Sequence, residues 1–482
     1  MISNWINGRR QSTTKRVGIE KYNPHTGKQD SLFLDSDVND VKLAIEAANS
    51  GFTLWSNITP VERGNILFKV VEEMKSQQQL LTAIVARETG KSLKDAGGEV
   101  NASIMQGHFF ASEGMRLYGR SLTSGTPGKY SHTVRQPLGI AGLIVPANTP
   151  IANIAWKVFP ALICGNSVIL KASEDAPEIA YVLGELFKTA GLPDGVLNIL
   201  QGKGEKVGAS MVENPAIAII SFTGSTRVGK WIAQKAGERL ARVSLELGGK
   251  NPFVVCDDAD LDQAAHWAVL SAFSNAGQRC SAGSRILIFE GVYDKFVEKL
   301  VAKTLILSLG ISEDSNIGPV INSNQQRKIL TAIDKAKKNG AKVLCGGKAP
   351  DAESLANGYY IEPTLISDVS EDNELVVNEL FGPVATLHSV SDLSHALKFA
   401  NSSLYGLTAA IHTSNVDRAM WFAQSVKAGV VNINIGTFGS EAHMPFGGFG
   451  LSGNGTREPG VEALDVYSEL KNISFLVRNS SI

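Results

Sequence analysis

Short apolar segments that alternate with helical patterns constrain the fold of this chain most strongly. Residues 139–145, 168–170, 196–200 and 217–222 are short and mainly apolar, and helix-like stretches separate them. Strands that are apolar on both faces are typical of a parallel sheet covered by helices on each side. The pattern therefore predicts an α/β fold built on a doubly wound parallel sheet.

A second α/β rhythm follows over roughly residues 250–450, with strands predicted at 285–290 and 430–434. Two strand-and-helix regions agree with a length of 482 residues, which suggests two to four domains.

Two helices are predicted before the first strand. Apolar residues recur at three- and four-residue intervals over 38–52, after Asp37 as a plausible N-cap. A second helix begins with the capping-box sequence at 59–62 and continues to a stop at Gly90.

Charge and cysteine content exclude several classes of protein. The 46 Lys and Arg residues against 47 Asp and Glu residues leave no basic surface typical of nucleic-acid or membrane-surface binding. The four cysteines form no CxxC pair, so neither a disulfide framework nor a metal site is expected. The chain starts without an apolar signal segment, and prolines and polar residues interrupt its most apolar stretch, 138–170. We expect a cytoplasmic protein that does not span a membrane.

Ligands of doubly wound sheets bind at the carboxyl ends of the strands, which here are the turns at 146–150, 171–175 and 223–226. The glycine-containing loop at 222–229 could bring a phosphate group to a helix N-terminus. It lacks the full GxGxxG pattern, and such loops are often glycine-rich for turn geometry alone.

Cys280 is a candidate nucleophile. Its neighbours are glycine, glutamine, arginine and serine rather than apolar residues, and Arg279 or a helix dipole could lower the pKa of its thiol. The alternative is that Cys280 is a small core residue, an interpretation that we keep for the other three cysteines.

Glu246 and Asn148 are candidates for proton transfer and oxyanion binding. Glu246 lies between two leucines at the end of an apolar strand, where burial would raise its pKa and make it a usable general base. Alternatively it pairs with Arg242. Asn148 follows a strand and could donate its amide N–H to a developing oxyanion, although asparagine is also common in ordinary turns.

Together these motifs resemble the NAD(P)-dependent aldehyde dehydrogenase superfamily, from the N-terminal Asn4 to the glycines at 447–455. The residues that carry the resemblance are Asn148, Lys171-Ala172-Ser173-Glu174, the Gly224 loop, Glu246-Leu247-Gly248-Gly249-Lys250, Gly277-Gln278-Arg279-Cys280, Glu379-Leu380-Phe381-Gly382-Pro383 and Pro445-Phe446-Gly447-Gly448. The separation of 34 residues between Glu246 and Cys280 (280 − 246) is also what that family shows.

The resemblance implies a role for each catalytic candidate. Cys280 would attack the aldehyde carbon, and the Asn148 amide with the Cys280 N–H would hold the oxyanion. Hydride transfer to NAD would leave a thioester, from which Glu246 would release the acid by activating water.

The resemblance also implies the cofactor site and its specificity. The cofactor-binding residues would be Lys171, Glu174, Gly204, Gly224, Ser225, Leu247, Glu379 and Phe381. A carboxylate at Glu174 would accept from the adenosine ribose and repel a 2′-phosphate, so we expect NAD, with NADP use possible.

The expected substrate pocket differs from the common family pattern. Ala147 and Thr149 stand where aromatic residues are frequent, and Asn153 stands where an apolar residue is frequent. The pocket residues would be Trp156, Asn153, Arg279, Ser281 and Phe446, with His443 at the channel. This polarity favours a polar or carboxylate-bearing aldehyde as substrate.

The resemblance finally implies a domain organisation. It consists of a Rossmann-like NAD-binding domain (residues 1–117 and 138–247), an α/β catalytic domain (248–448) and a small β oligomerisation arm (118–137 and 460–482). The tail at 473–477 is predicted to be a strand whose exposed edge needs a partner. We expect it to join a neighbouring subunit in a homodimer or homotetramer.

Three alternatives remain open. The first is a CoA-acylating aldehyde dehydrogenase, in which CoA receives the thioester, and retention of Glu246 argues against it. The second is a catalytically silent NAD-binding or structural protein. The third is a cysteine hydrolase that uses Cys280 and Glu246, which would leave the Lys171 and Glu379 segments without a purpose.

Overall fold

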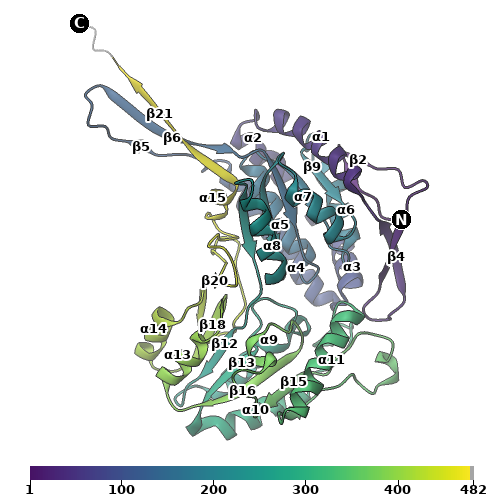
Figure 1. The fold of residues 1–482 in the computed structure, drawn as a ribbon, viewed down its shortest axis with the longest axis vertical. Coiled ribbons are helices and arrows are strands. Elements are labelled where there is room, and N and C mark those ends of the chain that lie inside the picture. The colour runs from purple at the N-terminus through teal and green to yellow at the C-terminus, as the bar shows by residue number, and fades with distance from the viewer. Residues whose placement is uncertain (478–482) are drawn as a thin grey trace.

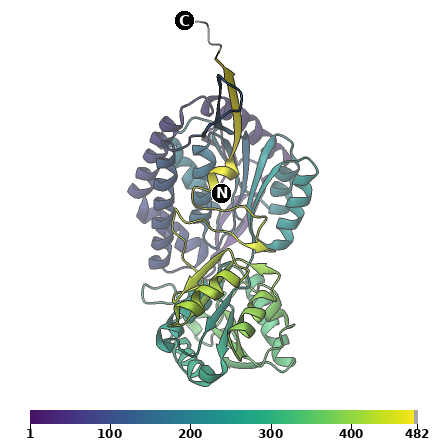
Figure 2. The same ribbon diagram turned by 90° about the vertical axis from the view of Figure 1, so that its left-hand side faces the viewer.

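Two seven-stranded sheets, each flanked by helices, make up most of the molecule (Figure 1). The computed structural model describes residues 1–477. Residues up to Glu246 supply the first sheet, and residues from Pro252 to Ile433 supply the second. Figure 2 shows one sheet region above the other. The predicted α/β class is confirmed, and the residue limits of the domains stay a prediction.

The first sheet has the strand order β11-β10-β7-β8-β9-β1-β2. Its strands are β1 (Trp5–Ile6), β2 (Arg9–Arg10), β7 (Ile140–Ile144), β8 (Ser167–Lys171), β9 (Leu197–Leu200), β10 (Ile217–Thr223) and β11 (Arg242–Glu246). The strands from β7 to β11 run parallel, and β1 and β2 form an antiparallel edge. Because β8 and β10 lie on opposite sides of β7, the winding direction reverses there, as in doubly wound sheets that bind ligands.

Side chains of β7 alternate between two cores, one on each face of the sheet. Ala141 and Leu143 belong to one core, whereas Ile140 and Ile144 belong to the other. The helices of the first core are α2 (Pro60–Ser76), α3 (Gln78–Thr89), α4 (Leu93–Glu113), α5 (Pro150–Ile163) and α6 (Pro177–Thr189). Those of the second are α1 (Val38–Trp55), α7 (Ala209–Glu213) and α8 (Thr226–Gly237), next to a π-helical turn at Gly204–Gly208.

The predicted helix from Pro60 to Gly90 is wrong in one respect, because it breaks at Gln77 into α2 and α3. Residues 75–80 are all exposed, so no core contact holds a single straight helix through them. The capping box is also only half formed: Thr59 accepts from the Glu62 N–H at 3.3 Å. A complete box starts α1 instead, between Asp37 and Asp40.

The second sheet has the order β14-β15-β16-β13-β12-β18-β19 and its own core. Its strands are β12 (Pro252–Val255), β13 (Arg285–Phe289), β14 (Lys342–Cys345), β15 (Thr364–Ser367), β16 (Val384–Val390), β18 (Thr408–His412) and β19 (Val430–Ile433). The flanking helices are α9 (Leu261–Phe273), α10 (Tyr293–Leu305), α11 (Ser323–Lys338), α12 (Glu374–Val377), α13 (Leu393–Asn401) and α14 (Val416–Ser425). Only the β14 pairing is antiparallel.

Two small antiparallel pairs accompany these sheets. They are β3 (Gly18–Tyr22) with β4 (Gln29–Leu34), and β17 (Tyr405–Gly406) with β20 (Phe449–Gly450).

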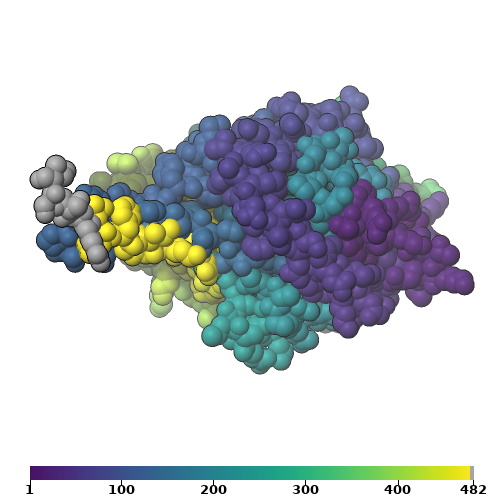
Figure 3. All heavy atoms as spheres, turned by 90° about the horizontal axis from the view of Figure 1, so that it is seen from above, coloured from purple at the N-terminus to yellow at the C-terminus, as the bar shows by residue number. Residues whose placement is uncertain are grey.

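An antiparallel arm projects from the end of the first sheet region, as Figures 1 and 3 show. It contains β5 (Ser121–Leu122), β6 (Lys129–Pro137) and β21 (Ser468–Leu476), and α15 (Ala463–Tyr467) leads into β21. The strand predicted at 473–477 lies mostly within β21, which pairs with β6 of the same chain. The order β21-β6-β5 leaves β21 with one free edge within residues 1–477. The last five residues of the predicted arm, 478–482, lie outside the described residues.

In the described part of the chain, no helix has both the length and the apolar character needed to cross a bilayer.

Candidate active site

A cavity of about 820 Å³ lies where the two sheet regions meet. Residues 146–149, 173–175, 223–227 and 246–248, which follow β7, β8, β10 and β11, line one side of it. Residues of the second sheet region, Cys280 among them, line the other. The turns predicted to carry chemistry therefore meet in one cavity.

Cys280 lies on the loop between α9 and β13, and its thiol faces a more acidic surrounding than the sequence suggests. Burial, together with the nearby carboxylates of Glu379 and Glu246, raises the pKa of the Cys280 thiol to about 12. Arg279 opposes this shift only weakly. Arg279 does lower the pKa as expected, but burial and the two carboxylates outweigh it. The expected helix dipole is absent, because Cys280 follows a left-handed turn rather than beginning a helix.

Glu246 is buried at the end of β11, with 4% of its surface exposed. Neither carboxylate oxygen has a hydrogen-bond partner within the described residues. Burial raises its pKa well above the ordinary value, and the charge of Glu458 adds to this effect. Arg242 instead donates to the backbone oxygens of Asp465, Val466 and Ser468, so it does not pair with Glu246.

A buried ion pair behind Glu246 was not predicted from the sequence. Lys157 Nζ lies 2.7 Å from Glu458 Oε2 and donates to Ser221 Oγ at 2.7 Å. Tyr467 and Ser244 donate to the other Glu458 oxygen. Lys157 partly offsets the pKa rise at Glu246. A lysine inside the apolar helix α5 was the available signal, because a buried ammonium group requires an acidic partner.

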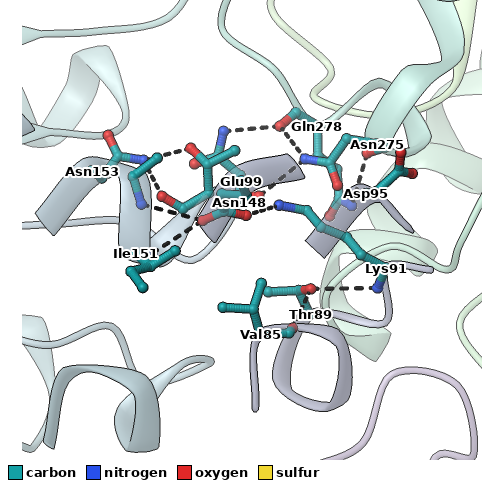
Figure 4. A network of polar contacts seen from close by, with 12 residues as sticks. Val85, Thr89, Lys91, Asp95, Glu99, Asn148, Ile151, Asn153, Asn275 and Gln278 are labelled. Atoms are coloured by element: carbon teal, nitrogen blue, oxygen red, sulfur yellow. Dashed lines mark hydrogen bonds and ion pairs between the residues drawn. The ribbon is translucent and has the colours of Figure 1, made fainter. Parts of the chain in front are cut away.

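Asn148 lines the cavity together with Cys280 and Glu246. Its Nδ2 donates to the backbone oxygen of Gln278 at 2.9 Å, as Figure 4 shows. The amide has a second N–H that can serve a ligand. The backbone N–H of Cys280 donates to no acceptor within residues 1–477. Two donors are thus available near the thiol.

Glu174 lies at the carboxyl end of β8 and lines the cavity, with 40% of its side chain exposed. One carboxylate oxygen accepts from the Gly204 N–H at 2.5 Å, and the other lies 2.8 Å from Lys171 Nζ. Lys171 and Gly204 do not line the cavity themselves, and they hold Glu174 in place.

Gly224 and Ser225 line the cavity at the start of α8. Ser225 is the N-cap and accepts from the Val228 N–H. The helix N-terminus presents backbone N–H groups and a partial positive charge, which suits a pyrophosphate.

Leu247, Glu379 and Phe381 complete the cofactor candidates, and all three line the cavity. Glu379 accepts from the Gly249 N–H at 3.1 Å, and burial raises its pKa to about 7. These groups fit a dinucleotide, because two carboxylates can accept from ribose hydroxyls and the N-terminus of α8 lines the same cavity.

The substrate candidates divide into two groups. Trp156, Asn153 and Phe446 line the cavity, and the rings of Trp156 and Phe446 lie 5.5 Å apart. Arg279 and Ser281 do not line it.

The guanidinium of Arg279 lies 5.1 Å from the centre of the Phe438 ring. Within the described residues it forms neither a hydrogen bond nor an ion pair, and its Nε is buried. Ser281 is buried as well. His443 is exposed and faces Glu441 at 3.9 Å. Within residues 1–477, Arg279 therefore makes a cation–π contact with Phe438 but has no hydrogen-bond or ion-pair partner.

Residues 1–477 contain no cluster of three or more histidine, cysteine or acidic side chains able to hold a metal ion.

Comparison with known proteins gives consistent matches. The model of the aldehyde dehydrogenase family matches residues 10–473. An alpha-ketoglutaric semialdehyde dehydrogenase of Bacillus subtilis is 39% identical over 442 residues, covering 91% of this chain and 90% of that protein. A retinaldehyde dehydrogenase 3 of Mus musculus is 39% identical over 461 residues, covering 94% and 88%. A crystal structure of betaine aldehyde dehydrogenase from Staphylococcus aureus in complex with NAD+ matches with a TM-score of 0.96 at 32% identity, covering 98% and 94%.

Proposed function

The chain belongs to the aldehyde dehydrogenase family, and we propose that it oxidises a polar, carboxylate-bearing aldehyde to the acid with NAD through Cys280, Asn148 and Glu246. One observation carries the assignment of these residues. All three line the same cavity as Glu174, Ser225 and Glu379, the residues suited to a dinucleotide.

Cys280 begins the reaction by forming a bond between its sulfur and the aldehyde carbon. Its high thiol pKa means that the proton must leave as the bond forms. The thiol proton passes to solvent, and Glu246, whose own pKa is raised by burial, stays available as the general base of the later hydrolysis step. The negative charge that develops on the aldehyde oxygen meets the free N–H of Asn148 and the backbone N–H of Cys280.

Bound NAD would supply the acceptor for the hydride that leaves the substrate carbon. The residues that would hold it are Glu174 and Glu379 at the ribose groups and Ser225 at the pyrophosphate. Cys280 is then acylated as a thioester. Glu246 takes a proton from water, the water oxygen attacks the acyl carbon, and the thiol leaves with a proton.

Sequence identity alone does not choose the substrate, because the semialdehyde and retinaldehyde relatives are equally similar to this chain. The side chains around the cavity favour the polar class. Asn153 and Thr149 line it. The Arg279 guanidinium, next to the nucleophile in sequence, does not line the cavity, but beyond its contact with the Phe438 ring it forms no hydrogen bond or ion pair within residues 1–477. A carboxylate at the far end of the substrate would give that cation a partner.

The test is the initial rate of NADH formation, without CoA, across matched aldehydes with and without a terminal carboxylate. We expect kcat/KM to favour the charged series, and Arg279→Gln to remove that preference while sparing the neutral aldehydes. A preference of the parent enzyme for neutral aldehydes overturns the substrate class and keeps the chemistry. A rate that requires CoA supports the CoA-acylating alternative.

Glu246 distinguishes hydrolysis from transfer to CoA. Glu246→Gln should preserve a first burst of NADH while slowing steady-state turnover, because the acyl-enzyme forms but is not hydrolysed. Equal loss of burst and turnover would show that Glu246 is needed before that stage.

The preference for NAD rests on Glu174, whose carboxylate is held toward the cavity by Lys171 and Gly204. A 2′-phosphate placed there would meet a negative charge. We expect Glu174→Ser to improve the use of NADP relative to NAD, and an unchanged ratio contradicts this assignment.

We also propose that the protein assembles through the arm and is cytoplasmic. The free edge of β21 supports a homodimer or homotetramer, and a nucleophilic thiol is best kept in a reducing compartment.

A further inference from the structure

The loop that carries Cys280 makes a left-handed turn just before the nucleophile. Asn275, Ala276 and Gly277 have φ values of 55°, 53° and 67°, a region that few residues besides glycine and asparagine adopt readily. A Cβ on Gly277 would stand 2.1 Å from the backbone oxygen of Gly382. The turn is therefore packed against the segment that carries Glu379, and such backbone persists only where its surroundings hold it.

The side chain of Asn275 supplies one of the contacts that hold this turn. Its Nδ2 donates to the backbone oxygen of Asn148 at 3.0 Å and to that of Gln278 at 3.3 Å. The Nδ2 of Asn148 donates to the same Gln278 oxygen at 2.9 Å. The two asparagines thus connect the end of β7 to the nucleophile loop through one shared carbonyl group, as Figure 4 shows.

These contacts restrict the Asn148 amide in two ways. The bond from Asn275 holds the Asn148 backbone, and the bond to Gln278 holds the plane of its side chain. The second N–H of Asn148 then has a fixed direction, on which a donor to a developing negative charge depends. Asn275 itself does not line the cavity.

We infer that Asn275 is a positioning residue that holds the Asn148 amide ready for the oxyanion and so sets the rate of the chemical step. This inference rests on the proposed function, in which Asn148 binds the oxyanion. Asn275 affects the rate through Asn148, since its own bond to the Gln278 oxygen helps to hold the carbonyl group that the Asn148 amide contacts. Substrate and cofactor binding do not depend on it.

Asn275→Asp tests this role with the smallest change. Aspartate also tolerates the left-handed backbone, but its carboxylate cannot donate and would face two carbonyl oxygens. We expect kcat to fall about 30-fold, with the dissociation constant of NAD changed by less than about twofold. Asn275→Gly is the companion variant: it removes the same donor in a residue free to adopt this backbone, and kcat should fall in the same way.

The deciding measurement is a double-mutant cycle with Asn148→Ala. If Asn275 acts through Asn148, Asn275→Asp lowers kcat about 30-fold in the parent but less than about threefold in the Asn148→Ala background. An equal fold-loss in both backgrounds overturns the inference while leaving the role of Asn148 intact. If Asn148→Ala alone leaves kcat unchanged, the oxyanion assignment in the proposed function fails first, and the inference fails with it.

Asn401→Asp is a matched control in the second sheet region. Asn401 donates to the Ser425 oxygen at 3.2 Å and accepts from the Lys427 N–H at 2.8 Å, and it does not line the cavity. We expect kcat within about twofold of the parent and no coupling to Asn148→Ala. A fall as large as that of Asn275→Asp would mean that any lost asparagine contact has this effect, and would overturn the inference.

Discussion

At the residue scale, the reactivity of Cys280 depends on charges that the fold brings to it. With a pKa of about 12, its thiol is almost entirely protonated at neutral pH, and the thiolate fraction rises with pH. We expect the rate of Cys280 alkylation by iodoacetamide in the cofactor-free protein to increase about tenfold per pH unit between pH 7 and 10. Peptide mass spectrometry over this range measures the rate, and a plateau below pH 9 contradicts the shifted pKa.

Glu379→Gln supplies the control for that experiment, because the Glu379 carboxylate is the charge that raises the Cys280 pKa most. The variant should be alkylated faster at each pH. Cys164, Cys256 and Cys345 are buried and should react more slowly than Cys280 in the folded protein.

Glu379 itself should make cofactor binding pH-dependent. Its pKa of about 7 is raised by burial, so the carboxyl is mostly protonated at pH 6 and mostly ionised at pH 8. An ionised carboxylate accepts ribose hydroxyls better, and we expect the dissociation constant of NAD to fall up to about tenfold from pH 6 to pH 8. Calorimetric titration measures it. Glu379→Gln should flatten the profile, and a flat profile in the parent enzyme would contradict the role of this ionisation.

These residues also show how far the sequence predicts a site. The burial of Glu246 follows from its own neighbours, two leucines at a strand end, and it was predicted correctly. The pKa of Cys280 depends first on burial and then on Glu379 and Glu246, which are distant in the chain, so the polar residues beside the cysteine indicated the wrong direction. The partner of Lys157, Glu458, lies 301 residues away and carries no local signal.

At the element scale, α5 begins at Pro150, two residues after Asn148, but has no side-chain cap of its own. Glu99 of α4 supplies the cap instead, because its carboxylate accepts from the Ile151 and Ala152 N–H groups at 3.1 and 3.3 Å. Its other oxygen pairs with Lys91. The side chains of Lys91 and Glu99 are 6% and 5% exposed. Figure 4 shows Glu99 beside the start of α5.

Removing one member of this pair should destabilise the protein strongly. Glu99→Gln keeps an oxygen for the cap but leaves the Lys91 ammonium buried and unpaired, which costs about 3–5 kcal/mol. We expect a clear drop in the midpoint of urea unfolding, followed by circular dichroism. Adding Lys91→Met should recover part of the loss, because no charge then remains unpaired. A midpoint that falls further in the double variant would contradict this explanation.

The same contacts explain which element boundaries the sequence predicts well. α1 starts at its predicted position, since its capping residues, Asp37 and Asp40, belong to its own first turn. The helices α5 and α6 are capped from elsewhere, by Glu99 and Glu88. Neither helix has a side-chain cap of its own, and the capping carboxylates could be found only in the folded structure.

At the scale of the whole molecule, the alternation of apolar strands with helices was sufficient to predict the doubly wound sheet. The order of the strands in the second sheet was not predicted, because β16 pairs with β13 and β12 pairs with β18, so neighbours in the sheet are distant in the chain. The arm was predicted only from the resemblance and from the apolar tail, and its pairing with β6 depends on a segment more than 300 residues earlier.

The arm gives the last prediction, which concerns assembly. The side chains of Leu470, Ile473, Phe475 and Leu476 are exposed on β21, and a narrow sheet with apolar residues in water is unstable unless something covers it. Its free edge adds unpaired backbone donors and acceptors. We expect the full chain to sediment as a dimer or tetramer at micromolar concentration, and a chain that ends at residue 470 to sediment as a monomer. The shortened chain keeps α15 and the contacts of Arg242 with the backbone at 465–468, so it should still fold and bind NAD.

Leu305→Ser, at an exposed apolar position on α10, should leave the assembly unchanged. A shortened chain that sediments like the parent would place the interface elsewhere, and a monomeric parent would remove the reason for the exposed apolar residues of β21.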